Sequence, residues 1–251
     1  MRENLKKPIL VDVVQNIWVI KIKNKSPCFF KGDIMKLIAI NGSPRNNWNT
    51  GKLLDKVLEG AKSENAEVEL VNLYDLEYQG CVSCFRCKRK DKKHGKCAMK
   101  DDLTPILEKL KEVDAIIFGS PIYFSAVSSG MSAFLERFLF SNMIYSNEIP
   151  TVFPKKIPSA FIYTMNITKE QMKEYGMEEK LKIFQYYIYR ILGKKSELLY
   201  AYNTYQFKDY DKYESSMFSK EEKIISKNEQ FPIDCKKAFE IGINIVKSAN
   251  K

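Results

Sequence analysis

The chain has 251 residues, 45% of which are hydrophobic, and it carries a formal net charge of +10. This length suits one sizeable domain with extensions, and the apolar content excludes a disordered chain. No apolar run approaches the roughly 20 residues of a membrane-spanning helix, and the first residues do not have the pattern of a signal peptide. We therefore expect a cytoplasmic protein that does not bind membranes.

The basic residues are spread along the chain rather than gathered in one motif. The sequence contains no helix-turn-helix, zinc-finger or aromatic RNA-binding signature, so we expect no nucleic-acid partner. The excess of positive charge indicates either a solvated surface or attraction to anionic partners, such as nucleotide cofactors and acidic electron carriers.

From residue 35 onwards, segments with strand-like patterns alternate with segments of helical periodicity. The expected strands cover residues 35–41, 66–73, 114–121, 157–165 and 196–205. The expected helices cover residues 52–63, 101–113, 128–140, 169–192 and 235–249. Such alternation predicts parallel strands joined by right-handed crossovers. The predicted fold is therefore α/β, a flavodoxin-like doubly wound sheet of five parallel strands in the order 2-1-3-4-5, with helices on both faces.

The chain divides into an extension and one domain. Residues 1–34 precede the first strand and form an N-terminal extension whose role the sequence does not define. Residues 35–251 form the predicted flavodoxin-like domain. Within it, residues 80–100 form a cysteine loop, and the charged, tyrosine-rich residues 206–232 form a surface excursion.

The loop NGSPRNNWNTG, residues 41–51, connects the first strand to the first helix. In a doubly wound sheet, ligands bind at the carboxyl ends of the strands, close to this loop. The N-terminus of a helix offers free N–H groups and a positive dipole end, which suit a phosphate. The loop has neither a Walker A nor a GxGxxG motif, so a mononucleotide with one terminal phosphate fits best, and a merely polar turn is the alternative. The candidate phosphate ligands are Ser43, Arg45, Asn49 and Thr50.

The loop after the third strand, GSPIYFSAVSSG, should lie at the same edge of the sheet. Its apolar and aromatic side chains suit a flat heterocycle such as isoalloxazine. The alternative is that the aromatic residues fill the core or a subunit interface. The candidate residues are Pro121, Ile122, Tyr123 and Phe124.

Four of the six cysteines follow the spacing C-x₂-C-x₂-C-x₉-C in a basic stretch. In a reducing compartment, clustered cysteines favour metal binding or redox chemistry over disulfides. Four thiolates suit a four-iron cluster or a tetrahedral zinc ion, and the close spacing of the first three is more typical of ferredoxin-type ligation. A basic loop that only docks a partner is the remaining alternative. The candidate ligands are Cys81, Cys84, Cys87 and Cys97.

Three motifs together resemble the NADPH-dependent FMN reductase family: NGSPRNNWNTGKLL, GCVSCFRCKRKDKKHGKCAMKDDL and GSPIYFSAVSSGMSAFLERF. The resemblance is greatest to the iron-sulfur flavoprotein branch, and it covers residues 35 to about 250. It implies non-covalently bound FMN, with the phosphate at the four candidate ligands named above and the isoalloxazine at residues 121–124. It also implies a homo-dimer or homo-tetramer. The chain departs from the family pattern at Trp48, where glycine is frequent, and in the longer gap before Cys97.

The function implied by this resemblance is that of an FMN-dependent oxidoreductase. Such a protein moves electrons between NAD(P)H, or a carrier, and a small acceptor or an iron-sulfur cluster. Its cofactors would be FMN and a 4Fe-4S cluster, with NAD(P)H as co-substrate. Because the flavin itself performs hydride transfer, we assign no catalytic side chain. Two alternatives stay open: a ferredoxin-linked electron-transfer flavoprotein without its own substrate, and a flavin-free binding or regulatory module.

Overall fold

The computed structural model describes residues 34–92 and 94–249, so the predicted N-terminal extension lies outside the described residues, apart from Ile34. Its central sheet has long parallel strands in the order β2-β1-β3-β5-β6, and the short strand β4 pairs antiparallel with the end of β3. These strands are β1 (Lys36–Asn41), β2 (Glu67–Asn72), β3 (Ala115–Tyr123), β4 (Ala126–Val127), β5 (Ser159–Thr164) and β6 (Glu197–Ala201). Because β5 and β6 are the fourth and fifth of the long strands, the predicted order and the flavodoxin-like fold are confirmed.

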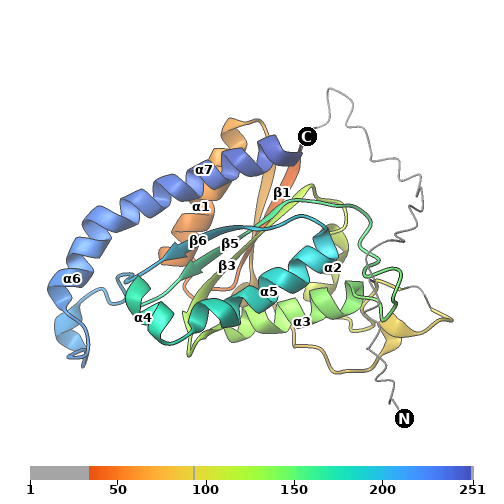
Figure 1. Cartoon of the computed structure of the whole chain (residues 1–251), viewed down its shortest axis with the longest axis horizontal. Coiled ribbons are helices and arrows are strands. Elements are labelled where there is room, and N and C mark those ends of the chain that lie inside the picture. The colour runs from red at the N-terminus through yellow and green to blue at the C-terminus, as the bar shows by residue number, and fades with distance from the viewer. Residues whose placement is uncertain (1–33, 93, 250–251) are drawn as a thin grey trace, which may run out of the picture. The chain divides into compact units, whose positions relative to one another are not determined.

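Helices cover both faces of the sheet, as predicted (Figure 1). The helices α1 and α7 pack on one face, and α2, α3 and α5 pack on the other. The bounds are α1 (Asn49–Ser63), α2 (Leu103–Lys109), α3 (Ser129–Asn142), α4 (Lys169–Glu174), α5 (Met177–Leu192), α6 (Lys220–Ile225) and α7 (Phe231–Ala249). Within the described part of the chain, no helix combines the length and the apolar character needed to cross a membrane.

The alternation of side chains along the central strands divides the core into two layers. Toward α3 and α5, the strands present large aromatic residues such as Phe118 and Phe161. Toward α1 and α7, the same strands present small residues such as Ala115 and Ala160. The helices on this second face also lie close together, since a Cβ at Gly60 of α1 would stand 2.0 Å from a backbone oxygen of α7.

Two predicted helices have different bounds in the structure. The helix predicted at residues 169–192 is divided into α4 and α5, because Gly176 between them has a left-handed φ of +60°. The last helix includes residues 231–234, before the predicted start at residue 235. The backbone is already helical through α6 and the π-helical turn Ser226–Gln230, so Pro232 lies within a continuous helical run, directly after the π-helical turn.

Residues 206–232 leave the sheet after β6 and return through α6 and a π-helical turn into α7. An aromatic cluster organises the first part, in which the rings of Phe207 and Tyr213 stack with centroids 4.3 Å apart. Lys223 of α6 is buried, and its ammonium donates to the backbone carbonyl of Asn166 at 2.6 Å and to the side-chain oxygen of Asn203. These contacts hold the segment against the loops that follow β5 and β6.

Candidate functional site

A cleft lies at the carboxyl ends of β1, β3, β5 and β6, and we call it the strand-end cleft. All of the phosphate-binding and ring-binding residues predicted from the sequence line it, except for Phe124. The other lining residues are Trp48, Thr164, Met165, Asn166, Thr204 and Gln206. The two predicted loops therefore meet at one site, together with the loops after β5 and β6.

The loop between β1 and α1 is held in shape by its own polar groups. The backbone N–H of Ser43 donates to the side chain of Asn41 (3.0 Å), and Ser43 Oγ accepts from the backbone N–H of Arg45 (3.2 Å). The turn is tight, because a Cβ at Gly51 would lie 1.7 Å from the carbonyl oxygen of Asn46. No described side chain caps the N-terminus of α1, and its first turn has no acidic residue. The first N–H groups of α1 therefore remain available to an anion.

Predicted phosphate donors in this loop contact the loop after β6. Arg45 Nη1 donates to the backbone carbonyl of Gln206 (2.7 Å), and Asn49 Nδ2 donates to that of Tyr205 (2.8 Å). Trp48 donates from Nε1 to the same carbonyl of Tyr205 (3.1 Å), and its ring lies 4.8 Å from the guanidinium of Arg45. An anion in the cleft would share these donors with two backbone carbonyls. The tryptophan thus joins the phosphate-side loop to the opposite wall.

The loop after β5 closes the floor of the cleft. The buried hydroxyl groups of Thr50 and Thr164 are hydrogen-bonded at 2.8 Å. The side-chain oxygen of Asn166 is buried and has no hydrogen-bond partner among the described residues. A buried acceptor without a hydrogen-bond donor destabilises the folded protein unless a ligand donates a hydrogen bond to it. The polar edge of an isoalloxazine carries an N–H donor, so this wall fits the predicted flavin.

Phe124 is the predicted flavin-side residue that the structure does not bring to the cleft. Phe124 and Ser125 form the two-residue turn between β3 and β4, with φ values of +49° and +66°. Positive φ at both positions defines a type I′ turn, which normally contains asparagine or glycine. The ring of Phe124 therefore projects from the tip of the hairpin and is fully exposed. Tyr123, by contrast, lines the cleft, and burial raises the pKa of its hydroxyl group.

A second pocket is lined by all the predicted metal ligands. We call it the cysteine pocket, and its cysteines are Cys81, Cys84, Cys87 and Cys97. The backbone coils tightly between the first three, because Ser83 and Phe85 have left-handed φ values of +51° and +55°. Such strained conformations at non-glycine residues concentrate at ligand-binding and active sites.

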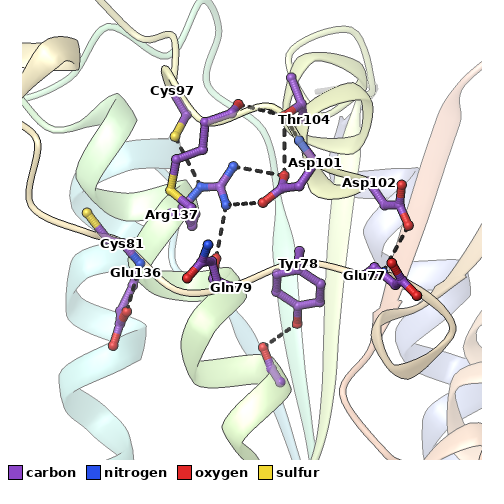
Figure 2. A network of polar contacts seen from close by, with 12 residues as sticks. Glu77, Tyr78, Gln79, Cys81, Cys97, Asp101, Asp102, Thr104, Glu136 and Arg137 are labelled. Carbon is purple, nitrogen blue, oxygen red and sulfur yellow. Dashed lines mark hydrogen bonds and ion pairs between the residues drawn. The ribbon is translucent and has the colours of Figure 1, made fainter.

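Helix α3 holds both ends of the cysteine loop (Figure 2). Glu136 accepts the backbone N–H of Cys81 (3.1 Å), and Arg137 donates from Nε to Sγ of Cys97 (3.1 Å). Arg137 also makes two hydrogen bonds to the carboxylate of Asp101, at 2.7 and 3.1 Å. Burial alone would raise the pKa of Asp101, but the bonds and charge of Arg137 outweigh burial and hold that pKa below its ordinary value.

Lys88 fastens the middle of the cysteine loop to the C-terminal end of α3. Its ammonium donates to the backbone carbonyls of Phe140 and Met143 and lies 4.6 Å from the centroid of the Phe140 ring. These are carbonyls that a helix leaves without internal partners, and a cation there is favoured by the helix dipole. Burial lowers the pKa of Lys88 and raises the pKa of the neighbouring Cys87 thiol.

Among residues 34–92 and 94–249, no group of three or more His, Cys, Asp or Glu side chains stands at the spacing of a metal centre. The donor set still fits a four-thiolate group in its chemistry, because the cysteines line one pocket and Arg137 lies beside the last of them. The sulfurs would have to converge to bind such a group.

The sequence reasoning did not identify the anchors of the cysteine loop. Glu136 and Arg137 lie on α3, which the sequence predicts as a helix without indicating a contact with the cysteines. The available signal was the position of Arg137, three residues after Phe134, on the stripe that faces the core. A charged residue on such a stripe indicates a buried polar contact.

Comparisons with known proteins agree with the motifs. Residues 35–150 match the family described as NADPH-dependent FMN reductase. An iron-sulfur flavoprotein of Methanocaldococcus jannaschii is 42% identical over 103 residues, which are 41% of this chain and 51% of that protein. An iron-sulfur flavoprotein of Archaeoglobus fulgidus is 39% identical over 109 residues, which are 43% of this chain and 51% of that protein. The chain therefore spans about half the length of these curated relatives.

Solved structures share the fold at low sequence identity. The NAD(P)H:quinone oxidoreductase from Methanothermobacter marburgensis has a TM-score of 0.64 and 15% identity, covering 85% of this chain and 98% of its own. The FMN-dependent NADH-azoreductase from Bacillus anthracis, solved in complex with FMN, has a TM-score of 0.59 and 14% identity, covering 86% of this chain and 100% of its own. The predicted resemblance is thus confirmed: residues 35–150 match the NADPH-dependent FMN reductase family, and the two relatives named above are iron-sulfur flavoproteins.

Proposed function

We propose that this protein is an FMN-dependent oxidoreductase that moves electrons between NAD(P)H, or a protein carrier, and a small acceptor or an iron-sulfur cluster. The observation that carries the proposal is the strand-end cleft, where the uncapped N-terminus of α1 meets the apolar end of β3. An anion site beside an apolar wall suits a flavin mononucleotide. The family match supports the same cofactor, and so does the FMN bound by the azoreductase of similar fold.

Each wall of the cleft has its own role in this proposal. The phosphate would be bound by Ser43, Arg45, Asn49, Thr50 and the first N–H groups of α1. The ring would lie against residues 121–123, and the side-chain oxygen of Asn166 would accept a hydrogen bond from its polar edge. Bound FMN supplies hydride and single-electron transfer, so no side chain is required as a catalytic acid or base.

We also propose that the cysteine pocket holds a 4Fe-4S cluster, bound by Cys81, Cys84, Cys87 and Cys97. Such a cluster supplies one-electron transfer, which complements the chemistry of the flavin. The names of the curated relatives support this cofactor, and so does the arrangement of the cysteines around one pocket. Zinc is the competing occupant, and a metal assay separates the two.

A ferredoxin-linked electron-transfer protein without its own substrate is the second candidate. The exposed cations beside the cysteine pocket favour it, since they would attract an acidic carrier. They include Arg86, Arg89, Lys90, Lys92 and Lys96. Slow oxidation of NAD(P)H, combined with fast electron exchange with ferredoxin that weakens as salt rises, would favour this candidate over the first.

The first test is the absorption spectrum of protein purified without oxygen, with iron, zinc and acid-labile sulfide measured on the same sample. Flavin bands over a broad iron-sulfur shoulder, with about four iron and four sulfide per chain, would support both cofactors. Flavin bands without iron or sulfide would leave a plain FMN reductase. A colourless protein that does not bind added FMN would overturn the proposal in favour of a flavin-free module.

The phosphate assignment is tested by replacing Ser43 and Thr50 together with alanine. Hydrogen bonds to a charged group each contribute about 1.5–3 kcal/mol, so the Kd for FMN should rise about 100-fold or more. Quenching of flavin fluorescence measures the Kd, and circular dichroism checks the fold. Ser63→Ala, at the opposite end of α1, is the matched control and should leave the Kd unchanged. An unaltered Kd in the double variant would refute the assignment.

The predicted homo-dimer or homo-tetramer stays a prediction for the whole protein. Sedimentation equilibrium of the FMN-loaded chain measures its mass directly. A mass of two or four chains would bear the prediction out, and a monomer at micromolar concentration would contradict it.

A further inference from the structure

A buried arginine lies directly beside the cysteine pocket. Arg137 is 1% exposed and is the largest of the fully buried side chains in the described part of the protein. Its guanidinium donates from Nε to Cys97 and from Nη1 and Nη2 to the carboxylate of Asp101. A further bond from Nη1 reaches the backbone carbonyl of Gln79 at 3.0 Å. Figure 2 shows these contacts converging on one guanidinium.

The contact with sulfur is not required by the ion pair itself. Asp101 already takes both terminal nitrogens of Arg137, so the pair would be complete without Cys97. The remaining Nε–H is nevertheless aimed at the sulfur, at 3.1 Å, a short distance for a bond to an atom as large as sulfur. A neutral thiol is a weak acceptor, whereas a thiolate or a metal-bound thiolate is a strong one. The arrangement therefore suits Cys97 as a ligand better than as a free thiol.

Cys97 is also the cysteine whose position the local sequence controls least. The first three cysteines are separated by two residues each, whereas nine residues separate Cys87 from Cys97. A loop of that length does not fix the position of its end by itself. Helix α3 supplies the missing constraint, because Arg137 ties Cys97 to the same helical turn at which Glu136 holds Cys81.

We propose that Arg137 is a positioning residue for the proposed cluster: it places Cys97 as the fourth ligand and donates an N–H···S hydrogen bond that stabilises the reduced cluster. This inference rests on the cluster named under the proposed function. Reduction adds one electron to the cluster and increases the negative charge on its sulfurs, so a fixed N–H donor aimed at Cys97 favours the reduced state. The potential of the cluster is then higher than it would be without Arg137.

The test compares two arginine–aspartate pairs in the same protein. Arg137→Gln with Asp101→Asn removes the buried pair and leaves no unpaired charge. The matched control is Arg89→Gln with Asp91→Asn, which removes an exposed pair of the same kind within the cysteine loop. Iron and sulfide are assayed in protein purified without oxygen. The potential is then measured by redox titration of the cluster's electron paramagnetic resonance signal, with FMN content and circular dichroism as checks of the fold.

The control pair should keep the iron content and potential of the unchanged protein. The buried double variant should either lose most of its iron or keep it with a cluster that is at least tenfold harder to reduce, a downward shift of about 59 mV for one electron. If that variant does not fold, Arg137→Lys decides the question by the same titration. It keeps the charge but not the fixed Nε–H, so its potential should also fall.

The possible outcomes distinguish a failure of this inference about Arg137 from a failure of the proposed cluster. Iron and sulfide in the unchanged protein, with the same potential in the Arg137 variants, would overturn the role of Arg137 and leave the cluster in place. A fall in stability without a change in potential would have the same meaning, since it is the mark of a purely structural pair. Absence of iron and sulfide from the unchanged protein would overturn both.

Discussion

The strand-end cleft and the cysteine pocket are built in different ways. The cleft gathers residues from the ends of several strands, so the sheet itself sets their spacing. The pocket lies on a long loop, and its spacing depends on a few side chains that attach this loop to α3. The cleft should therefore keep its shape through most side-chain replacements, whereas the pocket should lose its shape when one anchor is removed.

The largest effect is expected from a change that moves the backbone of the cleft. In Gly51→Ala, the new Cβ would stand 1.7 Å from the carbonyl oxygen of Asn46, so the loop must shift. We expect a loss of about 3 kcal/mol in the free energy of unfolding, the upper end for overpacked sites, and a large loss of FMN affinity. Urea denaturation and fluorescence titration measure the two quantities.

The matched control for that change is Gly176→Ala, where a new Cβ meets no atom within 4 Å. Its left-handed φ should still cost about 1 kcal/mol, without an effect on FMN affinity. Equal FMN affinity in the Gly51 and Gly176 variants would show that the cleft does not depend on the tight turn.

A pH-dependent effect is expected behind the cleft, at Lys223. Burial lowers the pKa of Lys223 to about 8, whereas an unfolded lysine titrates near 10.4. Between these values the unfolded chain binds more protons, so this lysine makes the protein more stable as the pH rises, by about 2 kcal/mol from pH 8 to pH 10.

The measurement is the free energy of unfolding of the unchanged protein minus that of Lys223→Met, followed over the same pH range. The difference should rise with pH, and a flat or falling difference would contradict the buried-cation assignment. Lys227→Met removes an exposed lysine from the following turn and should show no such rise.

A moderate effect is expected when the middle anchor of the cysteine loop is removed. Lys88→Met leaves the carbonyls of Phe140 and Met143 without their charged donor, which should cost about 1–2 kcal/mol. The iron content should fall as well, because the middle of the loop is no longer fixed to α3. Lys90→Met, an exposed neighbour, is the control and should change neither quantity. Iron retention equal in both variants would mean that the loop holds its shape without the Lys88 anchor.

The smallest effect is expected at the exposed pair of Arg89 and Asp91. Their side chains are 59% and 54% exposed, so solvent screens the interaction and Arg89→Gln should leave the free energy of unfolding nearly unchanged. Chemical denaturation at low salt is the most sensitive measurement. A loss as large as that of Lys88→Met would show that the surface of the loop also carries structural contacts.

The same contrast explains what could be predicted from the sequence. The sheet order and the position of the cleft follow from alternating strands and helices, because ligands bind where parallel strands end. The aromatic side chain of Phe124 predicts a place in the cleft beside Tyr123, but a hairpin that lacks the usual Asn-Gly signal turns it outward. The helical pattern of the sequence continues through Gly176, so it predicts one helix where the structure has two. The left-handed φ of Gly176, which divides them, is set only in the folded chain.

The spacing of the cysteines predicted which residues line the cysteine pocket, but it did not predict the side chains of α3 that fix their positions. The partners of Arg137 lie 36, 40 and 58 residues away in the chain, at Asp101, Cys97 and Gln79. Contacts over such separations leave no periodic pattern, and only the three-dimensional arrangement identifies them. The phosphate loop could be recognised because its polar groups are local and adjacent to a helix start.

The attachment of the cysteine loop to α3 also sets an order of events during synthesis. Arg137 follows Cys97 by 40 residues, so at about 5–20 residues per second a ribosome needs about 2 to 8 s to make the helix after it has made the last cysteine. Throughout that interval the nascent chain presents its thiols without the side chains that hold them. If Arg137 positions Cys97 as proposed, the four sulfurs reach their final arrangement only after α3 has been made and has joined the fold.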